Sequence, residues 1–162
     1  MKNRIIVLIL IFLGLIIYSD TYAQNGKVPP FRMIMSDGKM FKAEYLPIGK
    51  PIVIIYFSPD CEDCRKLTKD LLDRINDFKN VSFAMVTYQP VEFVDQFITK
   101  FNLSKYKNIY VGTEEKYQFL RNYYKIVHFP LVVLYNKNGD FIVKYNTKEI
   151  DLDNLLWNIK TR

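Results

Sequence analysis

Short apolar runs separated by polar turns predict a chain rich in β-strands. Residues 52–57, 81–87 and 131–135 are continuous apolar stretches, as expected for central strands buried on both faces. Shorter strands are predicted at 31–35, 40–43 and 108–111. Residues 141–145 follow the last long run across an Asn138-Gly139 pair, which is typical of a tight β-hairpin turn.

Apolar residues spaced by three and four predict helices between these strands. One helix begins near Cys61, a second follows Pro90, which suits a first helical turn, and the last starts at about Ile150. A further helix is expected from Thr113, as its cap, to Tyr124. Glu114 and Glu115 are expected near the positive end of the helix after Thr113. The predicted buried stripes are Cys64, Leu67, Leu71, Ile75 and Phe78 in the first helix, Val91, Val94, Ile98 and Phe101 in the second, and Leu152, Leu155, Leu156 and Ile159 in the last.

This order predicts an α/β fold with a central mixed sheet flanked by helices on both faces. Strands that alternate with helices pair in parallel, and the closing hairpin adds antiparallel strands. The chain has 162 residues, of which 49% are hydrophobic, so it suits one globular domain with a substantial core.

The N-terminus has the pattern of an export signal. A short basic region with Lys2 and Arg4 precedes an apolar stretch at residues 5–17, and Thr21-Tyr22-Ala23 supplies the small residues that signal peptidase accepts. The stretch is short against the ~20 residues of a membrane-spanning helix. We therefore expect a signal peptide at 1–23, a linker at 24–30 and the folded domain at 31–162, located in the periplasm or otherwise outside the cytoplasm. An uncleaved membrane anchor is the alternative.

The formal net charge of +6 changes this picture little. Its basic residues are scattered, and no nucleic-acid-binding motif accompanies them, so no nucleic-acid partner is expected. A solvated basic surface is the main interpretation, and a weak preference for acidic partners or anionic membranes is the alternative.

The chain has two cysteines, Cys61 and Cys64, and they are separated by two residues. Such a pair closes a very small loop and adds little stability, so it is of interest as chemistry. It follows a buried strand and opens a helix, whose first amides and dipole favour a thiolate. The position predicts Cys61 as the exposed nucleophile and Cys64 as the thiol that resolves a mixed disulfide.

In two segments the sequence resembles the thioredoxin superfamily, in particular exported redoxins of the TlpA/ResA type. The segments are Tyr56-Phe-Ser-Pro-Asp-Cys-Glu-Asp-Cys64 and Tyr124-Lys-Ile-Val-His-Phe-Pro130-Leu-Val-Val-Leu134. The resemblance implies a cis peptide bond between Phe129 and Pro130, with Pro130 facing the cysteine pair. It also implies that the backbone of Phe129 pairs with an extended substrate segment.

The sequence departs from that family at several positions. Asp60 stands where an aromatic residue often precedes the first cysteine, and Asp63 where many members have proline. Ile55 occupies the place of the buried acid that assists proton transfer in thioredoxin, and Glu44 is a candidate to reach the site from another element.

The acidic residues around the pair are candidates for tuning it. Asp60, Glu62 and Asp63 oppose a thiolate at Cys61, whereas Arg65 and Lys66 favour it, and the sequence leaves the balance open. If the acids dominate, the disulfide is relatively stable and the protein leans toward reducing other disulfides. His128, two residues before Pro130, is a further candidate for tuning.

The resemblance implies an exported thiol–disulfide oxidoreductase that uses no cofactor beyond its own dithiol. Reduction is the favoured direction, and oxidase and isomerase remain open. Its partners would be disulfide-containing exported proteins and a membrane electron donor, and we expect a monomer.

Other classes of function stay open at this stage. Cys61, Cys64 and His128 together would suit a copper or zinc carrier, although no metal site is expected. A peroxiredoxin-like peroxidase finds support in Ser58, three residues before Cys61, but Ile54 stands where that family has proline. A binding module that kept the fold and lost turnover is the third alternative.

Overall fold

The computed structural model describes residues 26–145 and 150–162. The predicted signal peptide and its cleavage site lie outside the described residues. Within those two ranges, no helix combines the length and apolar character that crossing a membrane requires.

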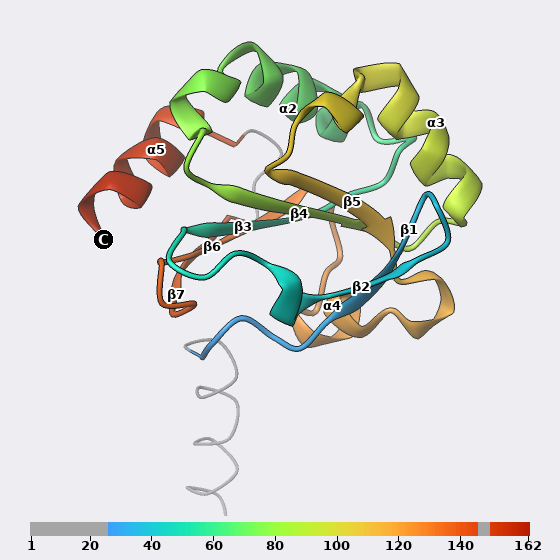
Figure 1. Cartoon of the computed structure of the whole chain (residues 1–162), viewed down its shortest axis with the longest axis horizontal. Coiled ribbons are helices and arrows are strands. Elements are labelled where there is room, and N and C mark those ends of the chain that lie inside the picture. Colours follow the sequence, from blue (N-terminus) through green and yellow to red (C-terminus); the bar gives the residue numbers. More distant parts are fainter. Residues whose placement is uncertain (1–25, 146–149) are drawn as a thin grey trace, which may run out of the picture.

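A single seven-stranded sheet forms the centre of the molecule, in the order β2-β1-β5-β4-β3-β6-β7 (Figure 1). β3 pairs in parallel with β4, and β4 with β5, whereas β6 joins β3 antiparallel and β7 joins β6 antiparallel. The predicted mixed sheet is therefore confirmed. The strands are β1 (Arg32–Met35), β2 (Met40–Lys42), β3 (Ile52–Tyr56), β4 (Ser82–Thr87), β5 (Ile109–Thr113), β6 (Leu131–Tyr135) and β7 (Phe141–Tyr145).

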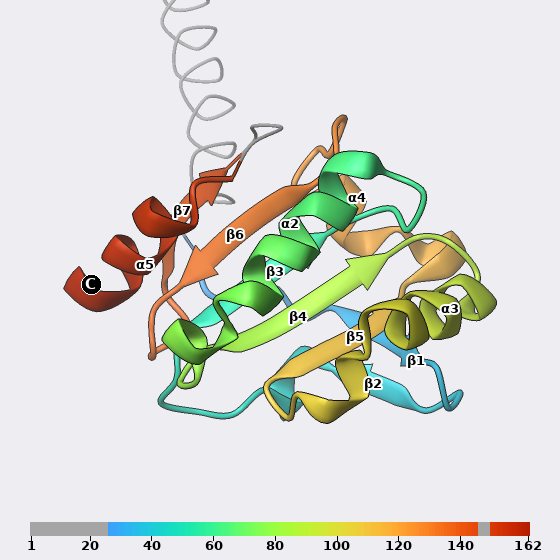
Figure 2. The same cartoon turned by 90° about the horizontal axis from the view of Figure 1, so that it is seen from above.

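Helices cover both faces of this sheet, as the sequence predicts. The helices are α2 (Glu62–Asp73), α3 (Val91–Phe101), α4 (Phe119–Tyr123) and α5 (Leu152–Thr161), with short 3-10 turns η1 (Ala43–Tyr45), η2 (Ile75–Phe78), η3 (Leu103–Lys105) and η4 (Glu115–Tyr117). Seen from above, α2, α3 and α5 lie on one face, with α2 across the middle of the sheet, whereas α4 lies on the other (Figure 2).

Alternating strand residues divide the core into two layers. Ile55 and Phe57 join Cys64 and Leu71 of α2 in the layer under α2, α3 and α5. The opposite layer packs Tyr56, with its neighbours on the same face of β3, against α4 and the N-terminal segment. One face of β3 therefore points toward the cysteines, and the other points toward α4.

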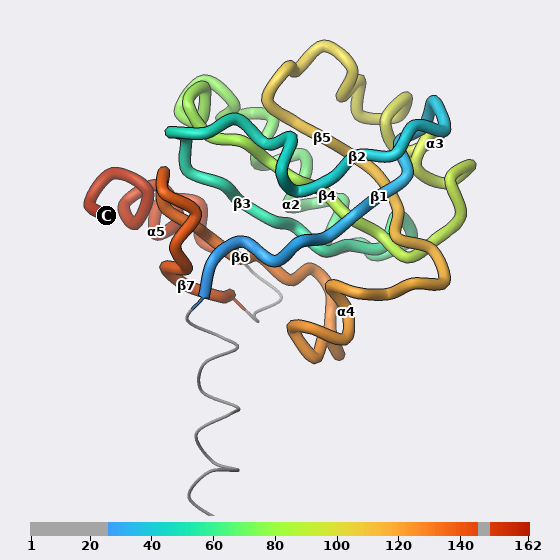
Figure 3. Tube along the Cα trace, turned by 60° about the horizontal axis from the view of Figure 1, so that its bottom comes forward, coloured from blue at the N-terminus to red at the C-terminus, as the bar shows by residue number. Residues whose placement is uncertain are grey.

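The N-terminal hairpin of β1 and β2 extends the sheet beyond β5. β1 pairs antiparallel with β5 at Ile34–Thr113 and Met35–Gly112. A Cβ at Gly112 would meet the carbonyl oxygen of Ile34 at 2.8 Å and the Met33 side chain at the same distance, so glycine permits this close approach. Further toward the N-terminus, the segment beginning at Gly26 runs beside the turn between β6 and β7, where Val28 N–H bonds the Gly139 carbonyl at 2.9 Å (Figure 3).

The helix expected from Thr113 to Tyr124 is wrong. Thr113 is the last residue of β5, and its hydroxyl donates to the Thr87 carbonyl at 3.2 Å instead of beginning a helix. The segment breaks into η4 and the short α4 because Glu115 and Gln118 adopt positive φ angles. Glu114, expected near the positive end of that helix, instead lies between β5 and η4 and is 2% exposed.

Two helix predictions need smaller corrections. The stripe predicted to run through Phe78 is interrupted, because α2 ends at Asp73 and Phe78 belongs to η2. In α3 the two buried residues are Val94 and Phe97, and Phe97 was not in the predicted stripe.

Candidate active site

The first cysteine sits where a turn after β3 enters α2. Cys61 is the N-cap residue of α2, and its sulfur accepts a hydrogen bond from the Cys64 N–H at 3.3 Å. The turn is closed by the Cys61 N–H, which donates to the Ser58 carbonyl at 3.0 Å. Both cysteines are free thiols, and Cys61 is half-buried. The Cys61 sulfur therefore receives a backbone N–H donor and lies at the positive end of the helix.

The second cysteine lies one helical turn later, on the buried face of α2. Cys64 is 1% exposed and packs in the same core layer as Ile55. Burial raises the pKa of the Cys64 thiol well above its ordinary value, and its hydrogen bond with Cys61 adds to the rise. At neutral pH Cys64 therefore holds its proton, and Cys61 is the better placed of the two to act as nucleophile.

The segment before β6 lies against this pair. The peptide bond between Phe129 and Pro130 is cis, as the resemblance implied. The Phe129 carbonyl oxygen lies 3.8 Å from the Cys61 sulfur, within reach of a weak S–H hydrogen bond. Pro130 is buried. The structure thus brings together the four residues that the sequence singled out as catalytic or substrate-binding, which are Cys61, Cys64, Phe129 and Pro130.

Residues 39–156 match the family described as the thioredoxin-like domain. The chain belongs to the thioredoxin-like family. The match spans β2 to α5 and includes the cysteine pair and the cis-proline.

Solved structures show the same thioredoxin-like fold. A secreted disulfide oxidoreductase of Mycobacterium tuberculosis, homologous to DsbE of E. coli, is 21% identical with a TM-score of 0.65 over 82% of this chain and 96% of that one. The thioredoxin domain of a Bacteroides vulgatus thiol-disulfide oxidoreductase is 22% identical with a TM-score of 0.67, over 86% and 96%. A thiol-disulfide oxidoreductase of Bacteroides fragilis is 14% identical with a TM-score of 0.61, over 73% and 88%. No curated protein sequence matches this chain.

An aromatic stack supports the cis-proline segment of this thioredoxin-like protein. The Phe129 ring stacks with the rings of both Tyr56 and Tyr88, at centroid distances of 5.9 and 5.7 Å and interplanar angles of 24° and 21°. The Arg121 guanidinium lies 5.1 Å from the Tyr88 ring centroid and 5.9 Å from that of Phe129. The side chain next to the Cys61-facing carbonyl is therefore held by two rings and a cation.

A buried carboxylate anchors this stack from below. Glu114 accepts the Tyr56 hydroxyl at 2.7 Å, the Leu120 N–H at 2.8 Å and the Arg121 N–H at 3.3 Å. The buried acid of this protein, Glu114, therefore lies on the sheet face opposite Cys64. The position on the Cys64 face where thioredoxin has its buried acid is occupied by Ile55. Glu44, the sequence candidate for a second acid, is exposed and pairs with Lys42 at 3.1 Å.

The predicted tuning acids lie around the start of α2. Asp60 is exposed, and its carboxylate accepts the Gln89 side-chain amide at 2.9 Å. The same amide donates to the Ser58 hydroxyl at 2.9 Å, which links the turn before Cys61 to the loop after β4. Glu62 and Asp63 occupy the first turn of α2. Gln89 contacts both Ser58 and Asp60 of this turn, and no pattern in the sequence pointed to it.

His128 does not join the cysteines. Its side chain is exposed and lines a cavity of about 400 Å³ whose other lining residues do not include either cysteine. Among the residues that the structure describes, no three His, Cys, Asp or Glu side chains gather as a metal site would require. The grouping of Cys61, Cys64 and His128 that a metal carrier needs is therefore not formed here.

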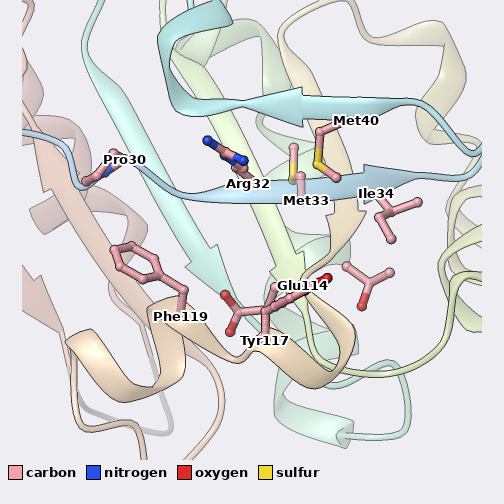
Figure 4. A pocket seen from close by; sticks show the side chains of 9 residues that line it. Pro30, Arg32, Met33, Ile34, Met40, Glu114, Tyr117 and Phe119 are labelled. Carbon is pink, nitrogen blue, oxygen red and sulfur yellow. The ribbon is translucent and has the colours of Figure 1, made fainter.

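A separate cavity of about 340 Å³ opens on the α4 side of the sheet (Figure 4). Side chains of β1 and β2 face those of the segment after β5 across it. Neither cysteine contributes to its wall, so it is distinct from the dithiol site. Its lining residues are Pro30, Arg32, Met33, Ile34, Met40, Thr113, Glu114, Tyr117 and Phe119.

Proposed function

We propose that this protein is an exported thiol–disulfide oxidoreductase that reduces disulfides of other exported proteins. One observation carries the proposal. The half-buried Cys61 sulfur caps α2, with the Cys64 thiol buried one turn behind it and the Phe129 carbonyl beside it. This arrangement makes the Cys61 sulfur accessible to a client protein and keeps the Cys64 thiol buried beside it, where it can resolve a mixed disulfide.

The reaction follows from these positions. The Cys61 thiolate attacks one sulfur of a client disulfide, so a Cys61–client disulfide forms and the client's other sulfur leaves and takes a proton. Cys64 then loses its proton and attacks the Cys61 sulfur, which releases the second client thiol. The client gains two electrons and two protons, and the protein is left with a Cys61–Cys64 disulfide.

The cis-proline segment is the proposed docking edge for the client chain. The Phe129 carbonyl faces Cys61, so an extended client segment that bonds to this backbone places its disulfide against the nucleophile. Pro130 has no N–H and therefore adds no backbone donor of its own beside the Phe129 carbonyl.

A return path for electrons completes the proposed cycle. We expect a membrane-bound electron donor to reduce the Cys61–Cys64 disulfide, with no cofactor beyond the dithiol. The N-terminal pattern of residues 1–23 and the likeness in fold to a secreted oxidoreductase support an extracytoplasmic location. Asp60, Glu62 and Asp63 outnumber Arg65 and Lys66 at the start of α2, and this excess of negative charge would favour the disulfide, which suits a reductant.

A trapping experiment tests this function. Reduced Cys64→Ala protein is mixed with insulin, whose disulfides serve as the probe, and the products are separated without reductant and weighed by mass spectrometry. We expect a one-to-one covalent adduct through Cys61, because no thiol remains to resolve it. Cys61→Ala should form none, and the unsubstituted protein should release free insulin chains. Adducts with Cys61→Ala but not Cys64→Ala would refute the assigned roles, and no adduct with either would refute the function.

A further inference from the structure

The side chain of Arg121 lies beside the docking edge, and no anionic partner for it is present among the described residues. Its guanidinium lies over the Tyr88 and Phe129 rings. Across residues 26–145 and 150–162, the ion pairs within 4.0 Å do not include this guanidinium. A guanidinium that lies over aromatic rings keeps N–H donors at its edge for a planar anion such as a carboxylate.

The position of this cation is fixed by the network that supports the docking edge. Glu114 binds the backbone N–H groups of Leu120 and Arg121 and, through the Tyr56 hydroxyl, the ring against which Phe129 stacks. Glu114 is 2% exposed and already accepts these three donors, and within the described residues it forms no ion pair with the Arg121 guanidinium. One buried carboxylate therefore sets both the Phe129 ring and the cation next to it.

The charges around Cys61 are arranged with opposite signs on its two sides. Asp60, Glu62 and Asp63 lie on the α2 side, and Asp60 is tied to Gln89 there. Arg121 lies on the cis-proline side, over the Phe129 ring and 5.9 Å from its centroid. Arg65 and Lys66 partly offset these acids, so a client segment that crosses this site meets a small excess of negative charge at the α2 flank and positive charge at the other.

We propose that the site selects disulfides in which a carboxylate side chain, Asp or Glu, lies next to the reactive client cysteine on the Phe129 side. In this proposal the Arg121 guanidinium binds the client carboxylate. The inference rests on the proposed function and names the substrate class within it. Because Arg121 is half-buried against two rings, its ion pair with a client is worth about a two- to fivefold difference in rate.

Peptides with an activated disulfide test this preference in a single step. Each peptide carries one cysteine joined to 2-thiopyridine, with Glu, Gln or Lys immediately before or immediately after that cysteine. The Cys61 thiolate attacks the peptide sulfur, the Cys61–peptide disulfide forms, and pyridine-2-thione leaves with a proton and is followed by absorbance. Only this first attack releases pyridine-2-thione, so the absorbance reports it alone. Cys64 then displaces the peptide thiol, and the pre-reduced dithiol supplies both electrons.

The expected result is a position-dependent charge preference. At one of the two positions the Glu peptide should react about two- to fivefold faster than the Gln peptide, and the Lys peptide more slowly. Arg121→Gln should abolish the Glu-to-Gln ratio and Arg121→Glu should invert it. Lys137→Glu, the same charge reversal at an exposed residue of the β6–β7 turn, should leave the ratio unchanged. Added salt should reduce it.

The ratio of the Glu-peptide rate to the Gln-peptide rate distinguishes recognition of a carboxylate by Arg121 from a purely structural role of this residue. If Arg121→Gln slows all peptides equally and the ratio persists, Arg121 only supports the stack and the inference is overturned. Equal rates for Glu and Gln peptides at both positions overturn it as well, as does a Lys137→Glu effect equal to that of Arg121→Glu. If Cys61→Ala releases pyridine-2-thione as fast as the unsubstituted protein, the proposed function fails first, and the inference fails with it.

Discussion

At the scale of single residues, the two cysteines differ because only one of them is buried. They are three positions apart on the same helix start, yet Cys61 is half-buried and Cys64 is 1% exposed. The sequence predicted this difference from the stripe of α2, since Cys64 belongs to the apolar face and Cys61 precedes it. Burial then raises the pKa of Cys64, so the resolving thiol stays protonated until a mixed disulfide forms beside it.

The raised pKa of Cys64 predicts a pH-dependent stability of the reduced protein. In the unfolded chain this thiol loses its proton near 9.0, whereas the folded protein keeps it bound. The stabilisation of the folded protein that results from this pKa difference is complete below pH 9 and is lost as the pH rises further. Urea unfolding at pH 7 and pH 10 should show the unsubstituted protein losing about 1.4 kcal/mol more than Cys64→Ala.

The comparison with Cys64→Ala isolates this one group. Tyr56, Tyr124 and Tyr135 also have pKa values raised by burial, but they are present in both proteins and their effect cancels. Equal losses in the two proteins would contradict the burial of Cys64 as an uncharged thiol.

At the scale of elements, the parts that the sequence predicted are those with local signals. Apolar runs identified β3, β4 and β6 to within one or two residues, and the Asn138-Gly139 pair identified the hairpin. The segment after β5 was mispredicted because its conformation depends on Glu114, whose partners are 58, 6 and 7 residues away in sequence. The roles of Gln89 and Arg121 likewise come from packing between distant segments.

The Glu114 network predicts a large effect from a substitution that changes few atoms. Glu114→Gln replaces a carboxylate that accepts three donors with an amide that has one acceptor oxygen, so a buried donor loses its partner. The free energy of unfolding should fall by about 1–3 kcal/mol in urea titrations. Tyr56→Phe removes one of the donors and should cost about 1 kcal/mol.

The neighbouring residue provides a matched control. Glu115→Gln makes the same chemical change at a partly exposed carboxylate and should shift the free energy of unfolding by less than about 0.5 kcal/mol. Similar effects at positions 114 and 115 would contradict the anchoring role of Glu114.

At the scale of the whole molecule, the fold brings three chain segments to one place. The turn after β3 supplies the cysteines, the loop after β4 supplies Tyr88 and Gln89, and the segment before β6 supplies Phe129 and Pro130. β3 is paired with both β4 and β6, so the ends of these strands lie side by side. The parallel pairing of the central strands and the antiparallel closing hairpin could be predicted from the sequence. The place of the N-terminal hairpin beside β5 could not, because no local sequence pattern indicates it.

The reduction potential of the Cys61–Cys64 pair tests the central claim most directly. The purified protein is equilibrated with defined dithiothreitol or glutathione buffers, and its free thiols are counted. A reversible two-electron couple at a thioredoxin-like potential, about −270 mV, is the result that we predict for a disulfide reductase. A potential near that of a strong oxidant, about −120 mV, would contradict the direction of the reaction, and the absence of any reversible couple would contradict the thiol–disulfide function itself.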